Sequence, residues 1–137
     1  MSWAVIDANI LYAATDQRDS DHERARNALR IPGVRLVIPM LVLAEVFHLV
    51  GRRLGPDVGS RFVAGLGRIA VEPPLPEEWA RIAELVGQYR DFPLGGTDAS
   101  IVALAERLNI ETIITLDQRH FRAIRPRHVE AFRLLPE

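Results

Sequence analysis

The sequence has 137 residues, 48% of them hydrophobic, and a net charge of −1, which predicts one globular domain over residues 1–137 with its own core. All 17 basic side chains are arginine, and the absence of lysine excludes a P-loop nucleotide site and Schiff-base chemistry. The absence of cysteine excludes thiol nucleophiles, thiolate zinc sites and disulfides.

Apolar periodicity and cap residues predict helices that alternate with strands along the whole chain. In chain order we expect a strand at 3–8, helices at 9–14 and 20–30, a strand at 34–39, helices at 40–55 and 56–70, a short strand or turn at 71–74, a helix at 76–90, a loop at 91–98 leading into a helix at 97–109, a strand at 111–117, a turn at 118–121 and an edge strand at 128–136. Ser20 and Thr97 are the expected N-caps, Pro76 the expected first residue of its helix, and Gly55 the expected C-terminal stop.

This order of elements predicts a parallel sheet between two layers of helices. We expect the strand at 111–117 to lie beside the strand at 3–8 through a right-handed crossover. The ends of these strands carry Asp117 and Asp7. Both carboxylates should therefore lie at the edge of the sheet where open α/β folds bind ligands.

The sequence also contains features that bear on location. The longest apolar run, residues 36–50, is too short for a membrane span and includes Glu45 and His48. No basic segment followed by an apolar one opens the chain, so no signal peptide is predicted. Because the chain has no disulfides, a reducing compartment suits it, and we expect a cytoplasmic location.

Three carboxylates each allow a structural explanation beside a functional one. Asp7 is well placed to cap the helix that follows the first strand. Asp98 follows Thr97 in the first turn of a helix, where its charge complements the helix dipole. Asp117 ends an apolar run, where a turn residue is expected. Taken singly, these residues leave both roles open.

Glu45 is harder to explain structurally. It is the only acid between Val34 and Arg53, in a helix that is apolar almost all round, so we expect it to be buried. A buried carboxylate is costly unless it pairs with an arginine or binds a cation. Within its own helix only His48 has the spacing of a partner. Together with the three aspartates, Glu45 predicts an oxygen-only site for Mg²⁺ or Mn²⁺, since like charges so grouped repel.

Histidines and arginines near these acids carry weaker indications. His22 and His120 fit surface or capping positions better than ligand positions. Arginines close to Asp117 fit a solvated face or a phosphate-binding role equally well. These arginines are Arg119, Arg122, Arg125 and Arg127, of which the first two are the candidates for contact with substrate.

The acids and their surroundings resemble the PIN-domain family of metal-dependent ribonucleases, and most of all its VapC-type branch, the toxins of type II toxin–antitoxin systems. The resemblance covers essentially the whole chain. It rests on the segments VIDANILYA, PMLVLAEV, GGTDASIVALAERL and TIITLDQRHF, in this order. It implies a PIN-like three-layer α/β/α sandwich with a central, mainly parallel sheet of about five strands.

The resemblance also implies the site and its chemistry. The catalytic and metal-binding residues it implies are Asp7, Glu45, Asp98 and Asp117. Asn9 and Thr115 match polar residues that support such a site, and Thr97 is expected beside them. Ala8 departs from the frequent Thr or Ser, which removes a hydroxyl contact but no ligand. The implied reaction is hydrolysis of RNA by a water that Mg²⁺ or Mn²⁺ activates, with 5′-phosphate and 3′-hydroxyl products.

The implied partners are an RNA substrate, a VapB-like antitoxin and a second copy of the chain. The helix at 40–54 and the glycine-containing helix after it have more apolar surface than one sheet face covers. We therefore expect a groove along these helices that takes an amphipathic or extended segment of the antitoxin. An arginine of that segment is expected to reach the acids.

Two other classes of protein place carboxylates similarly. Haloacid-dehalogenase-like phosphatases and receiver domains also carry an aspartate after an early strand, but they hold the phosphoryl group with a lysine that this chain lacks. The second alternative is a PIN-like module that binds RNA or a partner without turnover. Clustered acids that serve no reaction would only destabilise such a fold, which favours the nuclease.

Overall fold

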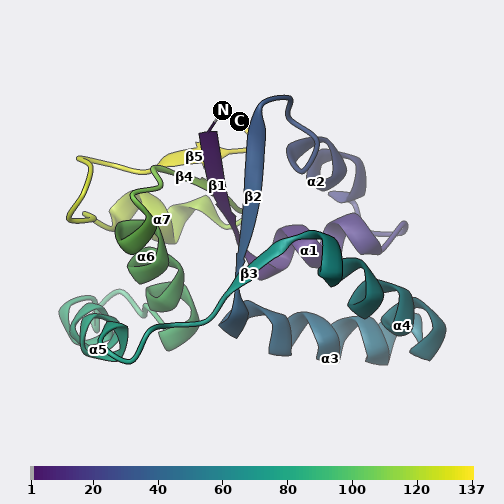
Figure 1. Cartoon of the computed structure of the whole chain (residues 1–137), viewed down its shortest axis with the longest axis horizontal. Helices are drawn as coiled ribbons and strands as arrows, with labels where there is room; N and C mark the ends of the chain where they lie inside the picture. The colour runs from purple at the N-terminus through teal and green to yellow at the C-terminus, as the bar shows by residue number, and fades with distance from the viewer. Residues whose placement is uncertain (1) are drawn as a thin grey trace.

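A five-stranded parallel sheet forms the centre of the molecule, as a computed structural model of the chain describes it for residues 2–137 (Figure 1). The strands are β1 (Ser2–Ile6), β2 (Val34–Pro39), β3 (Ala70–Glu72), β4 (Thr112–Ile114) and β5 (Arg133–Leu135). Their order in the sheet is β3-β2-β1-β4-β5, and all neighbours are parallel. The predicted α/β class and the placement of β4 beside β1 are confirmed.

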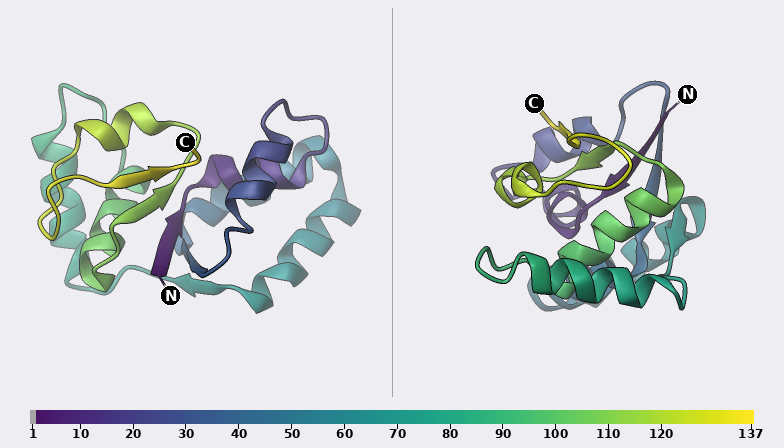
Figure 2. Two further views of the ribbon diagram at one scale, coloured as in Figure 1. Left: turned by 90° about the horizontal axis from the view of Figure 1, so that it is seen from above. Right: turned by 90° about the vertical axis from the view of Figure 1, so that its left-hand side faces the viewer.

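The helices cover both faces of this sheet. They are α1 (Ala8–Thr15), α2 (His22–Ala28), α3 (Leu43–Leu54), α4 (Pro56–Gly65), α5 (Glu78–Gln88), α6 (Gly96–Leu108) and α7 (Gln118–Ala123), with 3₁₀ turns η1 (Met40–Val42) and η2 (Leu66–Arg68). Helices α1 to α4 lie on one side of β1 and β2, and α5 and α6 lie on the other (Figures 1 and 2). This is the three-layer sandwich that the resemblance implies.

The core forms where the sheet meets α1 and α6. Ala4, Val5 and Ile6 of β1 are fully buried, as expected of a central parallel strand whose two faces are both covered. Helix α6 buries a continuous run from Ala99 to Ala105. None of the helices within residues 2–137 is long and apolar enough to cross a membrane.

The parallel pairing of β1 with β4 brings together the ends of these two strands, which lead into the candidate site. Ile6 of β1 pairs with Ile114 of β4, and the backbone N–H of Asp7 donates to the Ile114 carbonyl oxygen at 3.0 Å. From β1 the chain builds outward to β2 and β3, and then returns to β4 on the other side of β1. The order in which strands are added to the sheet therefore reverses between β1 and β4. Open α/β sheets bind ligands at such a switch point.

Three predicted helix starts are wrong by one or two residues. Asp21 rather than Ser20 occupies the N-cap of α2, because the Asp19 carboxylate accepts the N–H of Asp21 at 2.8 Å and holds the preceding residues in a turn. Gly95 rather than Thr97 occupies the N-cap of α6, since its extended backbone lets the helix begin at Gly96. Pro76 lies in the turn before α5, which begins at Glu78.

Other predicted elements differ in type or length. Residues 40–42 form a 3₁₀ turn after Pro39, so α3 begins later than predicted. Its last residue is Leu54, and Gly55 is its C-cap with a φ of 87°, as expected for a glycine stop. The helix predicted for 56–70 ends at Gly65 and continues as η2, and β3 begins at Ala70. Residues 118–123 form α7 instead of a turn, and the last strand covers only 133–135.

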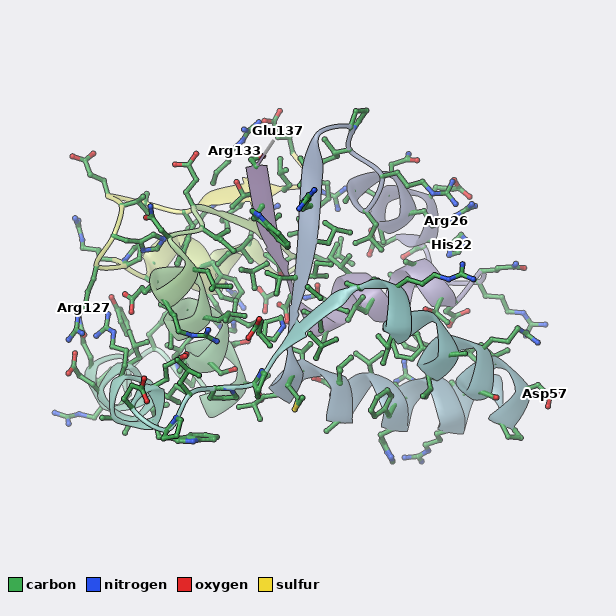
Figure 3. All side chains as sticks on the ribbon, viewed as in Figure 1. His22, Arg26, Asp57, Arg127, Arg133 and Glu137 are labelled. Carbon is green, nitrogen blue, oxygen red and sulfur yellow. The ribbon has the colours of Figure 1, made fainter. Side chains whose placement is uncertain are left out.

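An ion pair joins α5 to α6, the helix that carries Asp98. Arg81 donates to both carboxylate oxygens of Glu106 at 2.8 Å, and these side chains are 13% and 11% exposed. Burial opposes ionisation of Glu106, but hydrogen bonds from Arg81 and from the Arg127 N–H outweigh it and lower the pKa of this carboxyl. Figure 3 shows Arg127 at the α5 side of the molecule.

We expect Glu106→Gln to lower the free energy of unfolding by about 2 kcal/mol, because it removes the buried one of the two charged partners of Arg81 and leaves only the half-exposed Glu84. The folded pKa of Glu106 is lowered, so this contribution is present at neutral pH and is lost as the pH falls through that pKa. Urea unfolding at pH 7 measures the loss. Glu130→Gln, at an exposed position, is the matched control, and equal stability of the two variants would contradict the expectation.

Candidate active site

One cavity of about 270 Å³ lies at the carboxyl end of the central strands. Its walls come from α1, α3, α6, α7 and the loop between α1 and α2. The carboxylates that line it are Asp7, Glu45, Asp98 and Asp117, together with Asp19 and Asp21. The fold thus brings the predicted quartet to one cavity from separate elements of the chain.

Asp7 is the most buried of these acids, with 7% of its surface exposed. It is the N-cap of α1, and its Oδ1 accepts the Ala8 N–H at 2.7 Å. Burial is the main reason why its pKa is raised to about 6; the hydrogen bond from Thr115 lowers that pKa, and the charges of Asp98 and Glu45 raise it. The capping role and a role in the cavity therefore coexist in one side chain.

Thr115 and Asn9 hold Asp7 in place. The fully buried Thr115 donates its hydroxyl to Asp7 Oδ2 at 2.9 Å, and the Asn9 amide lies 3.4 Å from the same oxygen. Asn9 also accepts the N–H of Leu116 at 3.0 Å, and Thr115 accepts the N–H of Asp117 at 3.1 Å. These contacts lock the start of α1 to the end of β4.

Asp98 and Asp117 meet at His120. The His120 Nδ1 atom lies 3.1 Å from Asp117 Oδ2 and 3.8 Å from Asp98 Oδ2. Burial is the largest cause of the raised pKa of Asp98; His120 opposes the rise, and the charges of Asp117 and Glu45 add to it. The expectation that His120 is a surface or capping group is wrong, because α7 turns its side chain into the cavity.

Glu45 lies at the cavity but is exposed, so the prediction that it is buried is wrong. Helix α3 buries Leu43, Val46 and Val50 on one face, while Glu45 and His48 are exposed on the other side. The apolar composition of this segment therefore does not mean that all its faces are covered.

The remaining predicted site residues lie outside the cavity lining. Thr97 is in the first turn of α6, where its carbonyl oxygen accepts the Ser100 hydroxyl at 2.6 Å. Arg122 donates to Gln118 at 3.1 Å on the exposed side of α7, and Arg119 is exposed on the same helix. Asp19 and Asp21, which line the cavity, belong to the acid-rich run DQRDSD at residues 16–21, the only sequence signal for them.

The carboxylate oxygens of the cavity fit a hard cation that takes only a few of its ligands from the protein. Within residues 2–137, no group of three or more His, Asp or Glu side chains is arranged to hold a metal ion by itself. Mg²⁺ is commonly held by one or two carboxylates, with waters and substrate phosphates as its other ligands. Asp7 and Asp98 are the best candidates, because burial and neighbouring charges disfavour their ionised forms and a cation would relieve that cost.

The chain matches a known protein family over most of its length. The PIN domain model matches residues 4–125. A curated relative, Ribonuclease VapC26 of Mycobacterium tuberculosis, is 32% identical over 142 aligned positions, which cover 96% of this chain and 99% of the relative.

Solved structures with low sequence identity share the fold. VapC20 of Mycobacterium tuberculosis, described as a sarcin–ricin loop cleaving toxin, superposes with a TM-score of 0.78 at 18% identity over 85% of this chain and 92% of its own. A toxin–antitoxin complex from Klebsiella pneumoniae gives a TM-score of 0.72 at 23% identity over 88% of this chain and 92% of its own. VapBC2 from Rickettsia felis, bound to a DNA fragment from its promoter, gives 0.71 at 17% identity over 98% of this chain and 99% of its own.

Proposed function

Because the chain belongs to the PIN-domain family, we propose that it is a metal-dependent ribonuclease and the toxin of a VapBC-type toxin–antitoxin pair. The observation that carries this proposal is the cavity at the carboxyl end of the sheet, where four separate elements each contribute a carboxylate. The sequence identity of 32% with a VapC ribonuclease, over 96% of this chain, supports the same activity.

In this proposal Asp7, Glu45, Asp98 and Asp117 are the catalytic carboxylates, and they hold Mg²⁺ or Mn²⁺. When bound, the cation would polarise the scissile phosphate and lower the pKa of the attacking water. Asp7 is oriented for this by Thr115 and Asn9, which leave its carboxylate little freedom to rotate. Glu45, being exposed, can move towards the cation or its waters when substrate arrives.

The arginines of α7 supply the contact with substrate. Arg119 and Arg122 lie on the helix that Asp117 precedes, and both are exposed. Guanidinium groups bind phosphate oxygens with paired hydrogen bonds, so they can hold the phosphates beside the scissile one. They contact the backbone of RNA and not its bases, which makes them contributors to affinity and not to sequence choice.

Incubation of the protein with a mixed RNA pool tests the activity. Cleavage is expected with Mg²⁺ or Mn²⁺ and not with EDTA, and the products should carry 5′-phosphate and 3′-hydroxyl ends. RNA that is bound but not cut in the presence of either metal would favour the non-catalytic PIN-like module instead.

We further propose that a groove beside the cavity binds the VapB-like antitoxin. Its volume is about 940 Å³, and it lies between the end of α1 and the α3–α4 hairpin. Leu54, Val58 and Phe62 give it an apolar strip. Tyr12 and Asp19 line both the groove and the acidic cavity. A segment bound in the groove can therefore extend an arginine to the acids and block them.

Phe62→Ala is expected to weaken binding of the neighbouring gene product by about tenfold or more, because Phe62 is the aromatic side chain of the groove's apolar strip. Titration calorimetry with the purified partner measures the affinity. Trp79→Ala is the matched control, since Trp79 is 51% exposed on α5, on the other side of the sheet. Equal affinities of wild type and Phe62→Ala would place the antitoxin elsewhere.

A homodimer is the remaining partner in this proposal. The described surface carries several exposed large apolar side chains that a second copy would cover, among them Trp3 of β1 and Leu108 of α6. Light scattering of the isolated protein measures its mass. A strict monomer, alone and after mixing with the neighbouring gene product, would contradict both the dimer and the antitoxin complex.

A further inference from the structure

Within residues 2–137, His120 is the one side chain that forms an ion pair with both Asp98 and Asp117. Asp98 belongs to α6 and Asp117 precedes α7, and the His120 Nδ1 atom lies within 4 Å of a carboxylate oxygen of each. In the part of the chain that the structure describes, neither carboxylate has another ion-pair or hydrogen-bond partner among the side chains. The relative placement of these two acids therefore depends on one imidazole.

The need for such a contact follows from the surroundings of Asp117. Its backbone is fixed, because its N–H donates to Thr115, but its carboxylate does not cap α7 and its side chain is 48% exposed. A half-exposed side chain without a partner samples several rotamers. The contact with His120 Nδ1, 3.1 Å from Asp117 Oδ2, favours one of them, in which the same nitrogen also lies 3.8 Å from Asp98.

The imidazole ring of His120 packs against an aromatic side chain of a neighbouring loop. Phe92, in the loop between α5 and α6, packs edge to face against it, with ring centroids 5.2 Å apart and an interplanar angle of 85°. The Phe92 N–H donates to the Tyr89 carbonyl oxygen at 3.0 Å, which anchors this part of the loop to the end of α5. Phe121, next to His120, is buried and fixes α7 against the core.

We propose that His120 is a positioning residue that holds Asp98 and Asp117 in the arrangement that cation binding requires. This inference rests on the proposed metal-dependent nuclease and assigns a role to a side chain outside the carboxylate quartet. His120 acts through its Nδ1 atom, which lies 3.1 Å from Asp117 Oδ2 and 3.8 Å from Asp98 Oδ2, and Phe92 packs against the ring that carries this atom. Partners of metal-binding carboxylates commonly act in this way, and their loss costs about 10- to 100-fold in metal affinity or activity.

Two substitutions separate the donor from the shape of the ring. His120→Phe keeps an aromatic ring against Phe92 but removes the N–H, whereas His120→Asn keeps an N–H donor near the Nδ1 position. We expect His120→Phe to weaken Mn²⁺ binding by about 10- to 100-fold in titration calorimetry and to lower kcat with little change in KM for RNA. His120→Asn should recover most of both losses. His48→Phe, at an exposed position of α3, is the matched control and should change neither value.

Each outcome decides the role of His120. Unchanged Mn²⁺ affinity and kcat in His120→Phe would overturn it, and so would an equal loss in His120→Asn and His120→Phe. If His120→Phe does not fold, Phe92→Ala is measured instead, and it must weaken Mn²⁺ binding in the same direction. If wild type binds Mn²⁺ but cleaves no RNA, the nuclease proposal fails while calorimetry still decides the role of His120. Wild type that neither binds Mn²⁺ nor cleaves RNA would overturn both.

Discussion

Asp7→Asn is expected to lower metal-dependent RNA cleavage by about a thousandfold, while the protein stays folded. The substitution removes the charge of the most buried carboxylate in the cavity but keeps its shape. The amide oxygen can still accept the Ala8 N–H, so the N-cap of α1 survives. Loss of activity therefore reports the loss of the negative charge at the cation and not the loss of α1.

The measurement is the initial rate of RNA cleavage at saturating Mn²⁺, with thermal melting to confirm the fold. Asp57→Asn is the matched control, because Asp57 is exposed at the outer end of the α3–α4 hairpin (Figure 3) and does not line the cavity. It should cleave like wild type. If Asp7→Asn retained the wild-type rate in Mn²⁺, the proposed catalytic site would be wrong.

Asp7→Asn should also melt at a higher temperature than wild type in EDTA at pH 7.5. Burial raises the pKa of Asp7 to about 6 in the folded protein, whereas an unfolded chain has a value of about 3.9. The folded state thus binds the proton more tightly, and the free energy of unfolding falls as the pH rises from about 4 to about 6. Above that range the ionised carboxylate costs up to about 3 kcal/mol, which the substitution relieves.

Melting curves of wild type and Asp7→Asn between pH 5 and pH 7.5, in EDTA, measure this cost. The gap between the two proteins should widen with pH and reach roughly 5 to 10 °C at the upper end. Asp98→Asn should shift in the same direction, since burial and the charges of Asp117 and Glu45 raise the pKa of Asp98 as well. Asp57→Asn should follow wild type at every pH.

Addition of Mn²⁺ should close most of the gap in melting temperature between wild type and Asp7→Asn. A cation that binds only the folded state stabilises it by about 2.7 kcal/mol at a concentration one hundred times its Kd. Wild type should show this gain, and Asp7→Asn should lose most of it. Equal melting curves in EDTA, together with no response of wild type to Mn²⁺, would mean that the carboxylates do not share a cation site.

The sequence alone predicts which site residues lie at the ends of strands. Apolar runs that stop at Asp7 and Asp117 indicate buried parallel strands, and parallel strands of one sheet end at the same edge. Thr115 and Asn9 lie within two residues of those acids, so their contacts with Asp7 follow once β1 and β4 are neighbours. The positions of these four residues follow from the local apolar pattern and from the rule that parallel strands end at the same edge. Both can be applied to the sequence alone.

The surroundings of Glu45 and His120 were decided only by tertiary structure. Glu45 is exposed because α3 packs against its neighbours through Leu43, Val46 and Val50, and an apolar composition does not tell which face of a helix will be covered. His120 reaches Asp98 because residues 118–123 form a helix, which turns the imidazole into the cavity that Asp98 also lines. The distance between two side chains on different helices depends on how those helices pack, and neither residue type nor spacing along the chain contains it.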